Sequence, residues 1–278
     1  MDGGKERRGA GAGAHSLTSA PMNTPEFPLP AADRLRIVLV GTQHPGNIGA
    51  AARALKTMGL ARLVLVAPEQ FPAEEASRRA AGADDLLADA RVVATLAEGV
   101  ADCRYVLGCT ARSRRVQLEE FEPRQAAARA VTMAAQGEVA MVFGRERTGL
   151  TNEELQLCHA AVHIPANPEY SSLNLAAAVQ VLAYELRLAL RGQASSPAPE
   201  SRHPDDAPAS HAQLEGFFAQ LGQTLDEIDF HKGRTPDSAM RKLRRLFLRA
   251  DLSEQEVRLL RGVLADAQRM ARLADGRT

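Results

Sequence analysis

The sequence has 278 residues, 45% of them hydrophobic and 24% charged, a profile typical of a globular chain long enough for one large core and a smaller second unit. Its formal net charge is zero, so any nucleic-acid site has to be a local patch. No apolar run reaches the roughly 18 residues of a transmembrane helix, and three cysteines without metal-ligand spacing favour reduced thiols in the cytoplasm.

Residues 1–33 are rich in Gly, Ala, Ser and Pro and show no apolar period, which predicts a disordered N-terminal tail. A secretory signal peptide is disfavoured, because the middle of the segment lacks an apolar stretch and its charged end contains Asp2 and Glu6. Order is expected to begin near Leu35, where an apolar run starts.

Apolar runs and helical patterns alternate between residues 34 and 191. The expected strands cover residues 35–41, 61–68, 91–95, 104–110, 138–144 and 160–165. The expected helices cover residues 48–60, 72–82, 96–103, 123–137, 151–158 and 171–190. Such an alternation predicts an α/β domain with a mainly parallel sheet.

A composition change marks the end of this domain. Residues 192–210 are rich in Pro, Ser and Asp, which is typical of a linker. Residues 211–275 then show helical patterns in three pieces, at 211–230, 238–252 and 253–274. Because three such helices need a small shared core, the sequence predicts a helical C-terminal domain.

Unusual residues cluster in four loops, each of which follows a predicted strand. The loops span residues 41–53, 108–115, 144–149 and 164–174. Ligands bind beyond the carboxyl ends of the strands in an open α/β sheet. The four loops are therefore expected to meet at one edge of the sheet and to form a site there.

The first of these loops matches neither a P-loop nor a dinucleotide-binding glycine motif. Its helix is expected to start at Ile48, which leaves N–H groups available to a phosphate or another anion. Arg53 lies one turn into that helix, where it is either a solvated surface residue or a ligand contact.

The segment GRERTG has two interpretations. It is either a surface turn whose charges neutralise one another, or a loop whose flanking Gly144 and Gly149 let the backbone approach a ligand. In the second interpretation, Glu146 orients an arginine or a hydroxyl group. The histidines lack metal-ligand spacing and no G-x-S-x-G motif is present, so neither a metal site nor a serine hydrolase is predicted.

Two basic clusters are either solvated faces or contacts to nucleic-acid phosphates. One loop contains Arg112, Arg114 and Arg115, and the C-terminal helices contain Arg241, Lys242, Arg244, Arg245 and Arg249.

The segment NPEYSSLN raises a separate question, because Ser171, Ser172 and Asn174 precede an otherwise apolar helix. One of these three residues is expected to cap the helix. The remaining polar residues then need a functional reason.

Three motifs in order carry a family resemblance: GNIGAAAR at residues 46–53, VFGRERTGLTNEEL at 142–155 and IPANPEYSSLNLAAAVQ at 164–180. They resemble the motifs of the SPOUT superfamily, TrmH-like branch, over residues 35–190. With its basic C-terminal helices, the chain resembles the bacterial TrmJ type. That type comprises tRNA (cytidine/uridine-2′-O-)-methyltransferases acting at position 32 of the anticodon loop.

The resemblance implies a trefoil knot in the sheet domain, a homodimer with active sites between the subunits, a tRNA substrate and S-adenosylmethionine as cofactor. It implies a donor pocket made of Cys109, Thr110, Ala111, Gly144, Ile164, Ser171, Ser172 and Leu173. It implies motif roles for Asn47, Arg53, Glu146, Ser172 and Asn174, and tRNA binding by the basic clusters.

The resemblance places Arg53 at the ribose 2′-hydroxyl. Because a guanidinium stays protonated, it is a poor general base. We therefore expect Arg53 to stabilise the developing alkoxide and to anchor the adjoining phosphate. Ser172 is expected to position the hydroxyl group or relay its proton, and Asn174 to brace the motif loops.

Three alternatives stay open. The chain is another TrmH-like methyltransferase acting on a different tRNA or rRNA ribose, a non-catalytic RNA-binding module, or a phosphate-binding metabolic enzyme without RNA. The set of polar motif residues disfavours the binding module. The basic clusters disfavour the metabolic enzyme.

Overall fold

The computed structural model describes residues 31–111, 118–193, 207–232, 236–274 and 276. Most of the predicted tail, most of the predicted linker and three residues predicted to bind RNA lie outside the described residues: Arg112, Arg114 and Arg115. The expectations for these segments stay predictions.

A seven-stranded sheet forms the centre of the larger part of the described chain. Its strands are β1 (Leu35–Val40), β2 (Arg62–Val66), β3 (Arg91–Val93), β4 (Cys103–Cys109), β5 (Glu119–Phe121), β6 (Glu138–Phe143) and β7 (Ala160–Val162). Their order across the sheet is β3-β2-β1-β6-β4-β7-β5, and each pair of neighbours runs parallel. The predicted α/β class with a mainly parallel sheet is confirmed.

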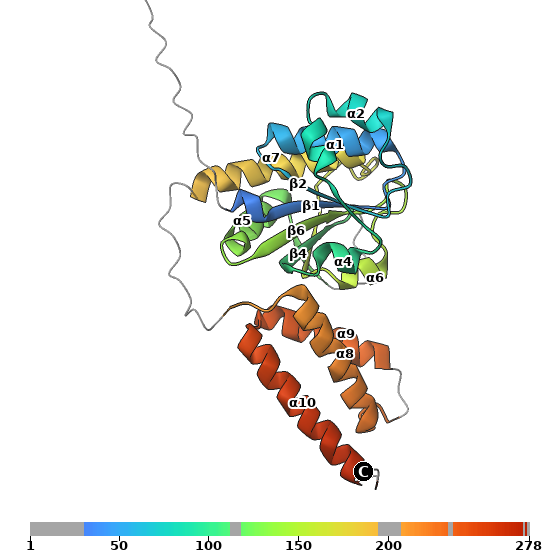
Figure 1. Ribbon diagram of the computed structural model, residues 1–278, viewed down its shortest axis with the longest axis vertical. Coiled ribbons are helices and arrows are strands. Elements are labelled where there is room, and N and C mark those ends of the chain that lie inside the picture. The colour runs from blue at the N-terminus through green and yellow to red at the C-terminus, as the bar shows by residue number, and fades with distance from the viewer. Residues whose placement is uncertain (1–30, 112–117, 194–206, 233–235, 275, 277–278) are drawn as a thin grey trace, which may run out of the picture.

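Helices pack on both faces of this sheet, and three further helices form a separate group at the C-terminal end of the described chain. They are the 3-10 helix η1 (Ala32–Arg34) and the α-helices α1 (Pro45–Thr57), α2 (Glu74–Ala80), α3 (Asp84–Ala88), α4 (Leu96–Val100), α5 (Pro123–Ala134), α6 (Asn152–Gln156), α7 (Leu175–Gln193), α8 (His211–Glu227), α9 (Pro236–Ala250) and α10 (Glu254–Ala274). Helices α1 and α7 cover one face of the sheet with α5 packed beside α7, whereas α4 and α6 cover the other face (Figure 1).

Several elements differ from the sequence prediction. The strand β5 was not expected, because it has three residues, two of them exposed glutamates, and its pairing with β7 alone makes it a strand. The short helix α3 was not expected either. Helix α1 begins at Pro45, three residues before the expected Ile48, since a proline suits the first turn of a helix.

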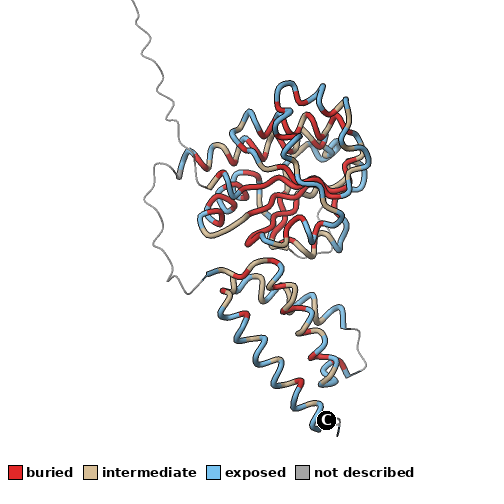
Figure 2. The backbone as a smooth tube through the Cα atoms, viewed as in Figure 1, coloured by how far each residue is buried: buried red, intermediate tan, exposed pale blue. Residues whose placement is uncertain are grey.

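Alternate residues of β1 show how the core is divided. Ile37 and Leu39 pack in the cluster under α1, α5 and α7, whereas Val38 and Val40 pack in the cluster with α4 and α6. All four are at most 2% exposed. Figure 2 shows the buried strands between the two helical layers. A strand buried on both faces is a continuous apolar run, which is why the sequence pattern predicts it.

The strand order also positions the four unusual loops. They follow β1, β4, β6 and β7, which are parallel, so all four leave the same edge of the sheet. The contact between β4 and β7 continues past the strand ends, because the Thr110 N–H donates to the Val162 carbonyl at 2.9 Å.

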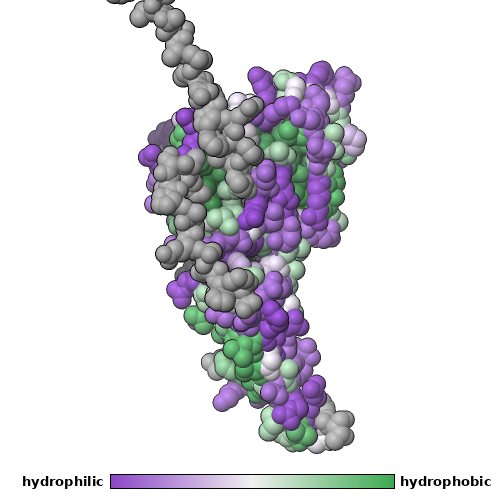
Figure 3. Space-filling model, turned by 60° about the vertical axis from the view of Figure 1, so that its left-hand side comes forward, coloured by the Kyte–Doolittle hydropathy of each residue, from purple (hydrophilic) through white to green (hydrophobic). Residues whose placement is uncertain are grey.

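Helices α8, α9 and α10 have a core of their own, which includes Leu214, Leu221 and Val257. In this core Phe217 packs edge-on against Phe247, with ring centroids 4.9 Å apart. Figure 1 places the three helices next to α4 and α6, and Figure 3 shows hydrophobic patches on their surface. No described helix combines the length and apolar character that crossing a membrane requires.

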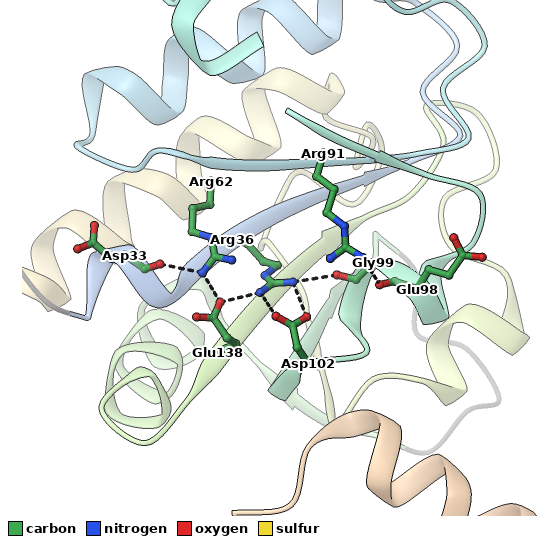
Figure 4. A network of polar contacts seen from close by, with 8 residues as sticks. All are labelled: Asp33, Arg36, Arg62, Arg91, Glu98, Gly99, Asp102 and Glu138. Carbon is green, nitrogen blue, oxygen red and sulfur yellow. Dashed lines mark hydrogen bonds and ion pairs between the residues drawn. The ribbon is translucent and has the colours of Figure 1, made fainter. Parts of the chain in front are cut away.

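An ion-pair network lies at the amino ends of the central strands (Figure 4). Arg36, whose side chain is 1% exposed, donates to both carboxylate oxygens of Asp102 at 2.7 and 2.6 Å and to Glu138 at 2.6 Å. Arg62 also pairs with Glu138. The two-pronged contact ties β1 to the turn before β4 and to the start of β6.

Replacing Asp102 with asparagine should lower the free energy of unfolding by about 1–3 kcal/mol at pH 7, because a buried guanidinium loses one of its two carboxylate partners. Burial would raise the pKa of Asp102, but the hydrogen bond and charge of Arg36 outweigh burial and lower it. The stabilisation is therefore present above the unfolded pKa of about 3.9 and is lost as pH falls through the lower folded pKa. Denaturant titrations at pH 7 and pH 3 measure this.

The matched control is Asp89→Asn, because Asp89 is exposed at the end of α3. It should leave the free energy of unfolding within about 0.5 kcal/mol of the wild type. Equal effects of the two substitutions, or an Asp102→Asn effect that is undiminished at pH 3, would contradict the role of the ion pair.

Candidate active site

A pocket of about 170 Å³ lies at the edge where the carboxyl ends of the strands meet. Three of the four predicted loops line it, and so do all eight residues predicted for the donor pocket, from Cys109 in the second loop to Leu173 in the fourth. The first loop does not line the pocket. It lies beside it, held by hydrogen bonds to Glu146.

Sequence reasoning missed part of the pocket wall. Phe143, Val162, Leu175 and Ala178 also line it, and each belongs to a strand end or to α7. They are ordinary apolar residues of strands and a helix, so nothing in the sequence distinguishes them from residues of the hydrophobic core. Only the meeting of β6, β7 and α7 shows that they face a cavity.

A hydrogen-bonded chain joins the three sequence motifs. One carboxylate oxygen of Glu146 accepts from the Asn47 side-chain amide at 3.0 Å, and the Asn174 amide donates to the Asn47 oxygen at 3.0 Å. The backbone N–H groups of Gln43 and His44 also donate to the Glu146 carboxylate, at 3.0 and 3.1 Å. Residues more than 100 positions apart are thereby held in one arrangement.

Backbone N–H groups around the start of α1 have partners within the protein. The carboxylate that meets the N–H groups before the helix belongs to Glu146, and the Gly46 N–H donates to the His44 ring nitrogen Nδ1 at 3.2 Å. Burial would raise the pKa of Glu146, but these hydrogen bonds outweigh burial and lower it. Glu146 is therefore ionised at neutral pH, and its hydrogen bonds fix the first loop.

The two glycines of the GRERTG loop serve the loop itself. A Cβ atom on Gly144 would lie 2.1 Å from the Gly149 carbonyl carbon, and Gly149 has a φ of +67°. Arg145 and Gly149 exchange backbone hydrogen bonds at 2.8 and 3.2 Å, which closes the loop. The glycines thus let the loop fold on itself at the pocket wall.

Arg145 is anchored on both sides. Its guanidinium donates to both oxygens of Glu154 in α6 at 3.0 Å. On the other side the guanidinium packs closely on the backbone of Gly41, since a Cβ atom added there would lie 2.8 Å from Nε. Glu154 also accepts from the Thr151 N–H at 2.7 Å, which completes a capping box at the start of α6. An arginine on the pocket wall is therefore oriented by the helix that follows it.

The cap of α7 is Asn174, and neither serine has that role. The Asn174 side-chain oxygen accepts from the backbone N–H groups of Ala176 and Ala177 at 2.9 and 3.3 Å, and the helix begins at Leu175. Ser171 and Ser172 line the pocket, while Asn174 both caps α7 and braces Asn47.

Arg53 is exposed on α1 and is not among the residues that line the pocket of this single chain. Of the basic residues predicted on α9, Arg241, Lys242 and Arg245 are exposed. Arg244 differs, because its side chain is only 17% exposed and pairs with Glu215 of α8.

Burial keeps two titratable side chains of the sheet domain uncharged. Burial lowers the pKa of His159 to about 3, and its ring accepts from the Val106 N–H at 3.2 Å, so the imidazole is neutral and structural. Burial raises the pKa of the Cys109 thiol well above its ordinary value, so it stays protonated on the pocket wall.

Comparison with known proteins identifies the family. The SpoU rRNA Methylase family model matches residues 34–184, and the model of the C-terminal domain of tRNA methyltransferase TrmJ matches residues 212–276. A tRNA (cytidine/uridine/adenosine-2′-O-)-methyltransferase TrmJ of Pseudomonas aeruginosa is 48% identical over 246 residues, 86% of this chain and 96% of that protein. The chain belongs to the TrmJ family.

Further relatives agree. A tRNA (cytidine/uridine-2′-O-)-methyltransferase TrmJ of Yersinia enterocolitica is 49% identical over 238 residues, 84% of this chain and 91% of that protein. The crystal structure of TrmJ from Z. mobilis ZM4 superposes with a TM-score of 0.70 at 38% identity, and the match covers 83% of this chain and 97% of that one. The TrmJ resemblance predicted from the motifs is confirmed, and with it a SpoU-type methyltransferase.

Membership of a methylase family supports S-adenosylmethionine as the cofactor, and the pocket residues fit it. Phe143, Val162 and Ile164 offer an apolar wall for an adenine ring, while Thr110 and Ser171 offer hydroxyl groups for ribose and amino-acid polar atoms. An apolar cavity with a few convergent polar groups is the usual form of a site for such a ligand.

Proposed function

We propose that the chain transfers a methyl group from S-adenosylmethionine to the ribose 2′-hydroxyl of cytidine or uridine at position 32 of the tRNA anticodon loop, in the cytoplasm. The observation that carries the proposal is the pocket lined by three of the four predicted loops, with Glu146 on its wall hydrogen-bonded to Asn47, which in turn accepts a hydrogen bond from Asn174. The P. aeruginosa and Y. enterocolitica relatives support a tRNA substrate, because their names specify 2′-O-methylation of tRNA.

The proposal includes an architecture. Residues 34–191 are the SPOUT catalytic domain and residues 211–275 the tRNA-binding helical domain, joined by a linker at 192–210. The insertion of β7 between β4 and β5, followed by the return of α7 to the α1 face, supports a trefoil knot. Exposed Tyr184 and Leu188 on α7 support a homodimer, since they leave apolar surface for a second copy.

In the proposed reaction, the bound donor supplies an activated methyl group, so the protein has to align the ribose oxygen and remove its proton. In this proposal Ser172, which is exposed at the pocket, hydrogen-bonds the 2′-hydroxyl and passes its proton to solvent. Arg53 stabilises the developing negative charge on that oxygen. Since Arg53 does not line its own pocket, we propose that each copy contributes Arg53 to the pocket of the other.

A direct assay tests this function. Purified protein, labelled S-adenosylmethionine and unmodified bulk tRNA are incubated, and the methylated nucleotides are mapped by mass spectrometry. A 2′-O-methylated cytidine or uridine at position 32 is the expected product. Methylation of rRNA instead would replace the substrate, and donor binding without transfer to either RNA would contradict the proposed reaction.

A further inference from the structure

Arg244 occupies the junction of three helices. Its guanidinium nitrogen Nε donates to the Gln156 carbonyl at the end of α6 at 2.9 Å. Both terminal nitrogens pair with the Glu215 carboxylate of α8, one of them at 3.1 Å, and the guanidinium carbon lies 4.6 Å from the centre of the Phe218 ring. Each of the three guanidinium nitrogens therefore already contacts a protein oxygen. An RNA phosphate would have to displace these contacts.

Other contacts hold the same interface together. Arg104 of β4, whose side chain is 4% exposed, donates to both carboxylate oxygens of Asp251 after α9 at 2.9 Å. The Ala212 N–H at the start of α8 donates to the Ala101 carbonyl at 2.9 Å. The helical domain is thus docked on the α4 and α6 side of the sheet domain through specific polar contacts (Figure 1).

The residue that Arg244 holds belongs to the helix that orients the pocket. Helix α6 spans five residues, with Glu154 in its first turn and Gln156 at its end. Glu154 anchors Arg145, which lines the donor pocket. Leu155 packs this short helix into the core, and the cation at its C-terminal carbonyl adds a second contact that fixes its position.

We propose that Arg244 is a positioning residue through which the docked helical domain holds α6, and thereby Arg145, in the geometry that binds the methyl donor. The inference rests on the proposed function, because it assigns the pocket to the donor. It also gives Arg244 a different role from the exposed basic residues beside it on α9. Exposed Arg241 and Lys242 suit contacts to tRNA phosphates, whereas the planar guanidinium of Arg244 is matched to a carboxylate, a carbonyl and a ring.

Calorimetric titration of the full-length protein with S-adenosylmethionine in the absence of RNA tests the proposal. Arg244→Ala should weaken donor binding by about tenfold. Arg244→Lys should not restore it, because a lysine keeps the charge without the fork-shaped contacts. The matched control Arg241→Ala should leave donor affinity unchanged while it weakens tRNA binding and reduces its dependence on salt.

The alternative role gives a different pattern. If Arg244 contacts tRNA, Arg244→Ala keeps wild-type donor affinity and binds tRNA more weakly. Arg244→Lys then restores tRNA binding. This result overturns the proposal. Should Arg244→Ala fail to fold, Glu215→Ala decides, because it removes the partner of Arg244 and keeps every basic residue of α9. Weaker donor binding in that variant supports the proposal, and unchanged donor binding overturns it.

Failure of the inference is distinguishable from failure of the proposed function. Wild-type protein that binds the donor and methylates tRNA, together with unaffected Arg244 and Glu215 variants, refutes only the positioning role. Wild-type protein that does not bind the donor refutes the assignment of the pocket itself.

Discussion

Replacement of Arg53 by alanine is expected to lower methyl transfer to tRNA by at least about a hundredfold, the usual loss when one charge-stabilising group is removed from a transition state. Donor affinity should stay within about twofold of the wild type, because Arg53 is not among the residues that line the pocket of its own chain. Single-turnover rates with labelled donor, and donor titrations without RNA, measure the two quantities. Wild-type turnover in this variant would refute the assigned role.

A mixing experiment shows whose pocket Arg53 serves. Co-expressing Arg53→Ala with Ser171→Trp, which places a bulky ring on the pocket wall, gives mixed dimers. If Arg53 acts across the dimer, each mixed dimer has one intact site, and random pairing restores about a quarter of wild-type activity. If Arg53 acts within its own chain, both sites of a mixed dimer are defective and activity stays at the level of the separate variants.

Replacement of Glu146 by glutamine is expected to lower methyl transfer by about a hundredfold. The carboxylate accepts three hydrogen bonds, from the Gln43 and His44 backbones and the Asn47 amide, and glutamine has only one oxygen to meet them. Hydrogen bonds to a charged group contribute roughly 1.5–3 kcal/mol each, so the loss of one or two matches this factor. The variant also releases the loop after β1 from the pocket loop, so donor affinity should fall as well.

The pH dependence follows from the direction of the pKa shift. Since the folded pKa of Glu146 is lowered, its contribution is present above the unfolded pKa of about 4.3 and is lost only as pH falls through the folded value. The ratio of wild-type to variant rates should therefore be the same at pH 6 and pH 8. A ratio that changes in this range would show that Glu146 titrates during the reaction and acts as an acid or base.

Glu69→Gln is the matched control for this experiment. Glu69 is exposed and also accepts a hydrogen bond from Gln43, at 3.1 Å. The donor in this case is the side-chain amide of Gln43 and not its backbone N–H. It should leave the rate and the donor affinity within about twofold of the wild type. Equal losses in the two variants would assign the effect to Gln43 and not to the motif carboxylate.

Much of the fold is predictable from the sequence, because strands buried on both faces are uninterrupted apolar runs. The run at residues 35–41 predicts β1, and the Thr151 and Glu154 capping pattern predicts the start of α6. Elements with no such pattern escape prediction. β5 is a strand only because β7 lies beside it, and Pro45 begins α1 where the glycines around it suggest a turn.

The candidate site divides in the same way. Its polar residues stand out in the sequence because apolar elements surround them, and the motif spacing identifies the family. The partner of each residue is not local information: Asn174 and Asn47 are 127 positions apart, and either asparagine alone suits a cap or a turn equally well. From the sequence alone, Ser171, Ser172 or Asn174 could cap α7, and only the structure shows that Asn174 takes this position.

The amino-acid sequence by itself therefore determined the class of fold, the edge of the sheet that carries the site and the family, since these depend on local apolar period and motif spacing. The tertiary structure alone decided which carboxylate holds which loop, that Arg53 is outside its own pocket, and that Arg244 lies in a domain contact. The physical reason is that a hydrogen bond or ion pair between distant positions depends on how the helices and strands pack, and that arrangement exists only after folding.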